Sequence, residues 1–464
     1  MTNYSPVSRM RSLFAGLTLL AAVTTVRPAF HGIAEAQTAA ATQPAAIAQN
    51  QAAVTEYDVN GLKVLVKRRP GSLTVAAGLF IKGGSRNLTA ENAGIEAVML
   101  DAASEASLNF PRGRMRDELS RMATSIGSSA SEDYSVLSLV CTRSNFDRSW
   151  RIFTDVALHP AFTDEDVALV RDRHLAALRS EADDPDSYLE LLEDRVAFTG
   201  HPYANRPEGT VESVSRITPQ ALRAYHDRVF TTSQLLLVVV GDVDPAAVRG
   251  LAAASLARLP RGSYTPARVP AFVFSEPTLN VTSQNLPTHY VQGLFAAPAP
   301  DDPDIYPMRI AMSILHDRVF EEVRVKRNLS YAPDAFLRTT QANVGGLYVT
   351  AVDANQAIQV MLNEVAKLQS EPVTADEIGQ SLGQFLTNHY IAEETNAAQA
   401  GVLARYELIG GGWRNADLFI PKLRTVTPAD VQRVARKYLR NIRFVVLGDP
   451  AGINRQIFTG VGVQ

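Results

Sequence analysis

The stretch EEVRVKRNLSYAPDAF, residues 321–336, carries an arginine, Arg324, and a tyrosine, Tyr331, seven residues later. Arg324 belongs to an amphipathic helical pattern, and Tyr331 follows the expected helix end at Asn328. A guanidinium is always charged and a phenol adds a hydroxyl donor, so the two side chains could hold a peptide carbonyl. In the structural alternative, Arg324 pairs with Glu321 on the helix surface and Tyr331 is half-buried packing.

Other chemically active side chains lack the partners that a catalytic site needs. The eight histidines are scattered, and the closest two are His159 and His174, so paired-histidine metal motifs are absent. There is no GxSxG motif, and Cys141 ends the strand-like pattern DYSVLSLVC. Asp101 and Glu105 lie one helical turn apart and could do acid–base chemistry, but a solvated helix face explains them more simply. The sequence offers no self-contained catalytic site.

Two segments that look like ligand loops fit structural roles better. In VVVGDVDPAA, Asp244 followed by Pro245 is typical of a capped helix start. The stretch LIGGGW, residues 408–413, lacks the Lys-Ser/Thr of a phosphate-binding loop and is typical of a helix-ending turn.

Local patterns predict both strands and helices. Alternating apolar residues around Asn60-Gly61 predict antiparallel strands. Apolar residues at helical spacing predict an amphipathic helix within residues 89–110, and the capping residues Thr163 and Asp166 predict the start of a second helix.

A repeat organises the whole chain. The segment ITPQALRAYHDRVFTTSQLLLVVVGDVD (217–244) recurs in outline as VTPADVQRVARKYLRNIRFVVLGDP (426–450), about 209 residues later. Each copy reads as a Thr-capped helix followed by a buried strand. We therefore expect an α+β protein of two homologous α/β-sandwich halves, each a mainly antiparallel sheet with packed helices. The expected domains are residues 54–260 and 278–464, joined by a proline-rich linker, residues 261–277.

The N-terminus has the features of an export signal. Arg9 and Arg11 precede the apolar run LFAGLTLLAAVTTV, and AEA stands before Gln37. Residues 1–36 are therefore expected to be a removed signal peptide, and residues 37–53 a flexible leader. The apolar run is too short to span a bilayer comfortably, so we expect an exported, periplasmic protein without a transmembrane anchor.

Composition fits a globular protein. The chain has 464 residues, of which 46% are apolar, and this is enough for two hydrophobic cores. Its formal net charge is −3. No Lys/Arg run stands out, so nucleic acid is not an expected partner.

Several stretches together resemble the insulinase/pitrilysin family of zinc metallopeptidases, the inverzincins. They are the repeat, HPYANRPEGTVESVSRITPQALRAYHDRVF and VRVKRNLSYAP, and the likeness spans about residues 55–450. The resemblance implies that the two halves form a clam-like half-shell. Active members hold zinc with HxxEH and a glutamate about 75 residues further on.

Those four zinc-site positions are degenerate in this chain. Aligned through GGS at 83–85 and Gly94, the motif falls on Ala97, Leu100 and Asp101, and the glutamate position falls on Ala177. The resemblance therefore implies no catalytic residue, no metal and no cofactor in this chain, with zinc expected in a partner subunit.

Arg324 and Tyr331 match an arginine–tyrosine pair that substrate-handling family members carry in the C-terminal half, although the family's glycine-rich segment before this helix is missing. The resemblance implies a zinc-free, substrate-binding subunit of an exported heterodimeric zinc metallopeptidase that acts on peptides or unfolded protein. Such a chain is not catalytic alone; its partner is a homologous, HxxEH-bearing, zinc-binding subunit. The alternative is a peptide-binding or assembly protein of the same fold without a proteolytic role.

Overall fold

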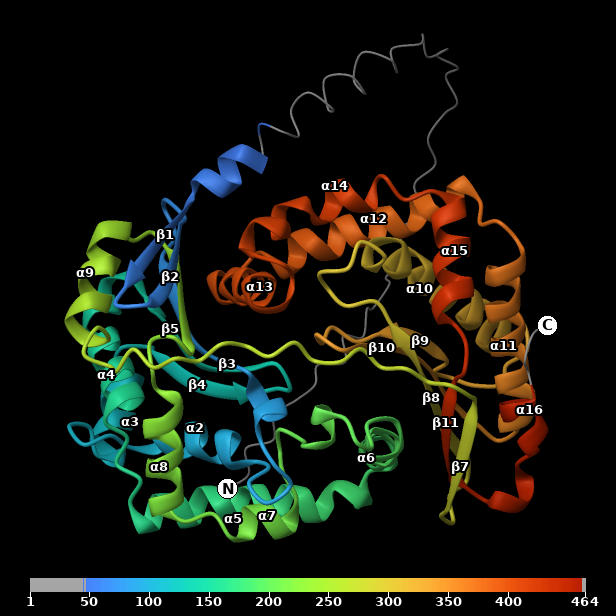
Figure 1. Cartoon of the computed structure of the whole chain (residues 1–464), viewed down its shortest axis with the longest axis horizontal. Coiled ribbons are helices and arrows are strands. Elements are labelled where there is room, and N and C mark those ends of the chain that lie inside the picture. Colours follow the sequence, from blue (N-terminus) through green and yellow to red (C-terminus); the bar gives the residue numbers. More distant parts are fainter. Residues whose placement is uncertain (1–44, 46, 461–464) are drawn as a thin grey trace, which may run out of the picture. The chain divides into compact units, whose positions relative to one another are not determined.

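The computed structural model describes residue 45 and residues 47–460 (Figure 1). The described residues from Ile47 onward form one compact unit. The predicted signal peptide lies outside the described residues, as does most of the predicted leader.

The first half is built on a six-stranded sheet in the order β1-β2-β6-β3-β5-β4. Its strands are β1 Val54–Val59, β2 Leu62–Arg68, β3 Thr74–Lys82, β4 Ser125–Ala130, β5 Tyr134–Thr142 and β6 Leu235–Gly241. All neighbours pair antiparallel except β2 and β6, which are parallel. The helices of this half are α2 Ile95–Glu105, α3 Arg112–Arg121, α4 Phe146–Leu158, α5 Asp164–Ser180, α6 Pro185–Ala197, α7 Val211–Ser215, α8 Pro219–Val229 and α9 Pro245–Ser255.

The second half repeats this plan with a five-stranded sheet in the order β7-β11-β8-β10-β9. Its strands are β7 Thr278–Ser283, β8 His289–Ala297, β9 Asp334–Leu337, β10 Asn343–Ala351 and β11 Arg443–Gly448. Here β7 and β11 form the parallel pair, as β2 and β6 do in the first half. The helices are α10 Ile305–Val319, the π-helical turn η5 Phe320–Val325, α11 Ala354–Ser370, α12 Ala375–Ala392, α13 Asn396–Ile409, α14 Phe419–Leu423, α15 Pro428–Tyr438 and α16 Arg455–Thr459.

The predicted repeat and the α+β fold of two homologous halves are confirmed. Helix α8 leads into β6 and helix α15 leads into β11, and each helix has proline in its first turn. The side chains of Thr218 and Thr427 accept hydrogen bonds from the backbone N–H groups of Ala221 and Asp430, so both cap their helices. Strand β6 is buried along its whole length, which explains its unbroken apolar sequence.

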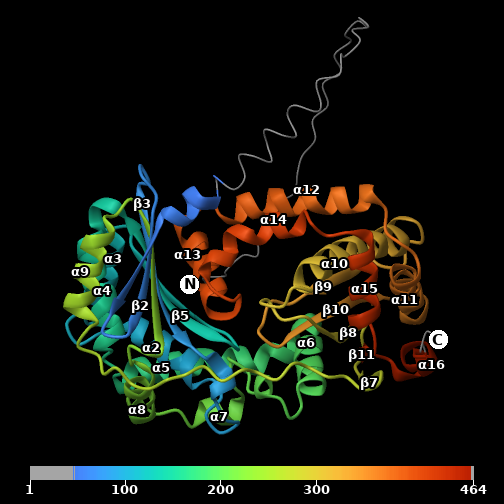
Figure 2. The same ribbon diagram turned by 45° about the horizontal axis from the view of Figure 1, so that its top comes forward.

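One helix from each half packs on the sheet of the other half. Leu189 of α6 is fully buried against Val445 and Leu447 of β11. Conversely, Leu403 of α13 packs among buried residues of the first sheet, including Leu236. Both views show α6 beside β8 and β11 (Figure 2). The two halves therefore share their hydrophobic packing.

The connector, residues 261–277, has no regular secondary structure but is not a bare spacer. Its residues Val269, Phe272 and Phe274 are buried, and the Phe272 ring stacks on Phe198 with centroids 4.8 Å apart. The same cluster contains Leu294 and Val344 of the second half, so the connector packs against both halves. The domain boundaries proposed from the sequence stay a prediction.

The helix expected within residues 89–110 is shorter than its apolar pattern suggested. It runs from Ile95 to Glu105, because Gly94 before it has a φ of 86° and Ala106 after it is extended. A Cβ at Gly94 would lie 2.8 Å from the carbonyl oxygen of Glu208, so this close approach requires glycine.

Candidate functional site

The helix that carries Arg324 changes its winding just before the site. α10 ends at Val319 and continues as the π-helical turn η5, and the N–H of Lys326 donates to the carbonyl of Glu321. Such wide turns inside helices occur frequently at functional sites. Buried Val323 anchors the turn, and the chain leaves it through Asn328, whose φ is 51°. The helical turn therefore ends at Val325, three residues before the end predicted at Asn328.

The structure brings Arg324 and Tyr331 together. The guanidinium carbon of Arg324 lies 4.0 Å from the centre of the Tyr331 ring and 5.0 Å from that of Phe320. Such a contact at an exposed site contributes about 0.5–1 kcal/mol. Tyr331 is 78% exposed, so it presents its hydroxyl and one ring face to solvent. The rings fix the orientation of the arginine while leaving its N–H groups at the surface.

Within residues 47–460, no carboxylate or hydrogen-bond acceptor binds the Arg324 guanidinium; its contacts are with the two rings. Glu321 lies 4.0 Å from Lys326, while Glu322 is held by Lys326 at 2.6 Å and by Arg327. These two cations lower the pKa of Glu322 to about 2. The neighbouring acids are thus occupied elsewhere, and the guanidinium donors are available to an added ligand.

Both parts of the structural alternative are therefore wrong: Arg324 does not pair with Glu321, and Tyr331 is not half-buried. The expected geometry also needs one refinement. We expected the Tyr331 hydroxyl beside the guanidinium, whereas the guanidinium lies over the ring face. The assignment of the pair to substrate binding stays a prediction.

The degenerate zinc positions lie where α2 packs against α5, but their side chains do not fit a zinc ion. Ala97, Leu100 and Ala177 offer no donor atom, and Leu100 is buried. Asp101 is already engaged: its Oδ2 lies 2.8 Å from His174 Nε2, and the Ser128 hydroxyl donates to its Oδ1. Burial raises the pKa of Asp101, but these two hydrogen bonds outweigh burial and hold that pKa below its usual value.

The acids around these positions serve as structural partners. Glu105 is buried and lies 2.9 Å from Arg173 and 3.0 Å from Arg116, so the predicted solvated helix face is wrong for Glu105, whereas the Asp101 side chain is 38% exposed. Glu181, on the chain just beyond α5, accepts a 3.0 Å hydrogen bond from Arg206. In the part of the chain that the structure describes, no group of three or more His, Cys, Asp or Glu could hold a metal ion.

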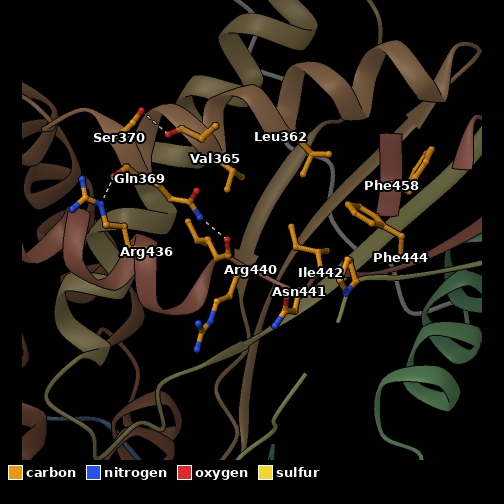
Figure 3. A pocket seen from close by; sticks show the side chains of 13 residues that line it. Leu362, Val365, Gln369, Ser370, Arg436, Arg440, Asn441, Ile442, Phe444 and Phe458 are labelled. Carbon is orange, nitrogen blue, oxygen red and sulfur yellow. Dashed lines mark hydrogen bonds between the residues drawn. The ribbon is translucent and has the colours of Figure 1, made fainter. Parts of the chain in front are cut away.

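A cavity of about 570 Å³ lies away from Arg324 and Tyr331, between α11 and the end of α15 (Figure 3). Leu362 and Val365 face Ile442 and Phe444 across it, and Arg436 donates to the Gln369 carbonyl at its rim. A smaller cavity of about 360 Å³ in the first half shares one wall with this cavity through the repeat. Its lining residues on and just after α4 match the α11 lining residues at an offset of about 210 residues: Arg151, Thr154, Asp155, Leu158 and His159 against Leu362, Val365, Ala366, Gln369 and Ser370. The opposite walls differ, because the end of α9 closes the first-half cavity and the end of α15, the repeat partner of α8, closes the second-half cavity.

Comparison with known families decides the class of the chain. Residues 63–207 match the model of the insulinase family, peptidase family M16, and residues 216–384 match the model of the peptidase M16 inactive domain. The chain belongs to the M16 peptidase family. Its residues 216–384 are of the inactive-domain type within that family.

Relatives of this M16 chain cover most of its length. An uncharacterized zinc protease of Mycobacterium tuberculosis is 24% identical over 86% of this chain and 93% of its own. The beta subunit of the mitochondrial-processing peptidase of Blastocladiella emersonii is 22% identical over 84% of this chain and 87% of its own.

Solved structures share the fold of this M16 chain. A protease from Helicobacter pylori has a TM-score of 0.78 at 17% identity, covering 85% of this chain and 99% of that protein. A peptidase M16 inactive domain from Pseudomonas fluorescens has a TM-score of 0.76 at 19% identity, covering 85% and 97%. Among the described residues, no helix combines the length and the apolar character that a membrane-spanning segment requires.

Proposed function

We propose that this M16 chain is the zinc-free, substrate-binding subunit of an exported heterodimeric metallopeptidase that acts on peptides or unfolded protein. Its partner is a homologous subunit that carries HxxEH and supplies the zinc. The observation that carries the proposal is the Arg324 guanidinium, which is oriented by two rings yet has no acceptor in the described part of the chain. The degenerate positions on α2 and α5 support a division of labour between subunits.

In this proposal the chain supplies hydrogen-bond donors and no nucleophile. Arg324 and the Tyr331 hydroxyl bind the carbonyl oxygen of the peptide and stabilise the negative charge that develops on it. Removing one such donor costs about a hundredfold or more in rate. A relative named as the beta subunit of a processing peptidase supports an arrangement of two different subunits.

Purified subunits test the proposal. The chain is prepared alone, with an HxxEH-bearing sibling, and as a mixture of both, and bound zinc and cleavage of an unstructured peptide are measured in each. We expect zinc and cleavage only where the sibling is present, and full activity only in the mixture. Stoichiometric zinc in the isolated chain contradicts the proposal.

The same samples separate the alternative, a peptide-binding or assembly protein. That function predicts peptide binding by this chain and no gain in cleavage under any pairing. Export is tested by fractionating cells that make the full-length protein: the mature chain is expected in the periplasmic fraction, and an uncleaved cytoplasmic chain contradicts this part of the proposal.

A further inference from the structure

Arg309 of α10, like Arg324 of η5, has no carboxylate partner among the described residues. Arg309 is the one charged side chain in the stretch IYPMRIAMSIL. Its guanidinium lies 5.4 Å from the centre of the Phe419 ring, and the described residues provide no carboxylate partner for it. Burial lowers the pKa of Arg309, while the Tyr406 phenol raises it and Arg405 lowers it again. A guanidinium nevertheless stays charged at neutral pH, so a half-buried positive charge is left without an opposite one.

Arg405 of α13 lines the same small pocket as Arg309, together with Tyr306, Thr339 and Tyr406. It too contacts a ring and no described carboxylate: its guanidinium lies 5.7 Å from the centre of the Tyr406 ring. Lys422 is not part of this lining, but its ammonium lies 5.0 Å from the centre of the Tyr306 ring. Two cations that line one recess, with hydroxyl groups beside them, form a receptor for an anion.

The recess opens beside a groove that can hold the rest of a ligand. The small pocket has space for about one water molecule. Arg309 also lines a cavity of about 300 Å³ between α10, β9 and α12. Met312, Leu337 and Phe385 give this groove apolar walls, and the amides of Gln384 and Asn388 add hydrogen-bonding groups. Its occupant therefore combines an anionic group at Arg309 with an extended, partly apolar body, as a peptide does.

The groove and the Arg324 site lie along one face of the same helix. Residues 309, 316, 320 and 324 follow helical spacing, and the His316 ring stacks on Phe320 with centroids 6.5 Å apart. The Phe320 ring in turn lies under Arg324. From Arg309 to Arg324 the helix extends about 20 Å, which is about the length of six residues of extended peptide.

We propose that Arg309 and Arg405 bind a carboxylate of the same peptide whose carbonyl Arg324 holds. The carboxylate is either the peptide's C-terminus or an Asp or Glu side chain several residues from the bond to be cut. This inference rests on the proposed function and assigns to it a substrate class, peptides with an acidic anchor. Neutral peptides bind without that anchor.

Fluorescence anisotropy with the isolated full-length chain tests the inference. The probes are one dye-labelled, unstructured peptide in three forms: a free C-terminal carboxylate, a C-terminal amide, and an amidated form with an internal glutamate. We expect at least one acidic form to bind about tenfold or more tightly than the neutral amide. This ratio is the gain in affinity that one hydrogen bond to a charged group typically gives. Which acidic form gains identifies the source of the carboxylate.

Substitutions test whether Arg309 and Arg405 cause the preference for acidic peptides. Arg309→Gln and Arg405→Gln are expected to remove the preference for the acidic form, and Arg324→Ala to leave that preference in place. Arg318→Gln is the matched control, because Arg318 is on the same helix but lies 2.7 Å from Glu377, and it keeps the preference. If Arg309→Gln does not fold, as judged by circular dichroism, Arg405→Gln carries the test.

The outcomes separate this inference from the function on which it rests. Equal binding of acidic and neutral forms by the wild type overturns the inference and leaves the proposed function standing. A preference that survives both Arg309→Gln and Arg405→Gln also overturns it. Failure of the wild type to bind any form overturns both.

Discussion

His174 Nε2 lies 2.8 Å from Asp101 Oδ2, so an imidazole–carboxylate hydrogen bond joins α5 to α2 at the positions that the family resemblance aligned with zinc ligands. Asp101 occupies a degenerate ligand position, and His174 lies one helical turn before Ala177, another such position. At these positions the two helices are joined by a direct side-chain contact.

Rebuilding the ligands tests this assignment. The variant Ala97→His/Asp101→His/Ala177→Glu places two histidines on α2 opposite a glutamate on α5, a donor set that suits zinc. We expect about one zinc ion per chain after dialysis, measured by atomic emission, and a higher melting temperature with zinc. The matched control without Ala177→Glu is expected to bind zinc more weakly. A folded triple variant without zinc contradicts the assignment of the four positions.

Helix α6 gives a second prediction, on stability. Leu189 of α6 is fully buried against β11 of the other half, so Leu189→Ala is expected to lower the free energy of unfolding by about 2–5 kcal/mol. Because each half supplies a helix to the other, a single cooperative transition is expected in wild type and variant. Calorimetry and urea unfolding measure both quantities. Leu169→Ala, at a 39% exposed site, is the control, with a change within about 0.5 kcal/mol. Two separate transitions in the wild type contradict the shared packing.

Glu193, next to that contact, gives a prediction on pH dependence. Burial raises the pKa of this fully buried carboxyl well above 4.5, although Arg338, 4.0 Å away, lowers it, and Asp194 and Glu190 raise it further. Gln292 of β8 donates to one of its oxygens. The folded protein therefore binds more protons than the unfolded chain, and the contribution of Glu193 to stability is lost as the pH rises from about 4.5 toward the raised pKa.

Glu193→Gln replaces the carboxyl by a neutral amide, so the variant does not lose stability through ionisation at this position as the pH rises. We expect the variant to have a higher melting temperature than the wild type at pH 8 and a similar one near pH 4.5. Thermal melts followed by circular dichroism at both pH values measure the difference. A variant that melts below the wild type at pH 8 contradicts the prediction.

Cys141 gives a prediction on reactivity. It is buried in β5, and burial raises the pKa of its thiol to about 11, while the Ser149 hydroxyl lowers it. At pH 8 the thiol stays protonated and shielded, so we expect Ellman's reagent to label the native protein slowly and the urea-unfolded chain at once. Rapid labelling of the native protein contradicts this.

Local sequence spacing was enough to predict the repeat and its caps. Thr218 and Thr427 precede a proline and an apolar helix, and the side chain that such a threonine offers to the backbone is a property of a few adjacent residues. The same holds for Asp244, which caps α9, and for Cys141 inside β5. The sequence also placed Arg324 and Tyr331 on either side of a helix end.

Contacts between distant segments could not be predicted in this way. The apolar stripe of α6 shows that Leu189 is buried, but not that it packs on the sheet of the other half. The three arginine partners of Glu105 come from two other helices, α3 and α5, so one sequence could not identify them. For Arg309 a signal existed, since it is a lone charge within an apolar helix, but its pocket is completed by α13 and α14. The π-helical turn before Tyr331 could not be predicted, because its apolar residues fit the spacing of an ordinary α-helix.

The most direct test of the central claim is the kinetics of the heterodimer carrying Arg324→Ala. The claim is that the unpaired guanidinium beside Tyr331 stabilises the transition state of a reaction catalysed at the partner's zinc. The account predicts a fall in kcat of about a hundredfold or more with little change in KM, and a smaller fall for Tyr331→Phe, which keeps the ring contact. Arg327→Ala, whose partner is Glu322, is expected to match the wild type. An Arg324→Ala complex that cleaves peptide at the wild-type rate would contradict the account.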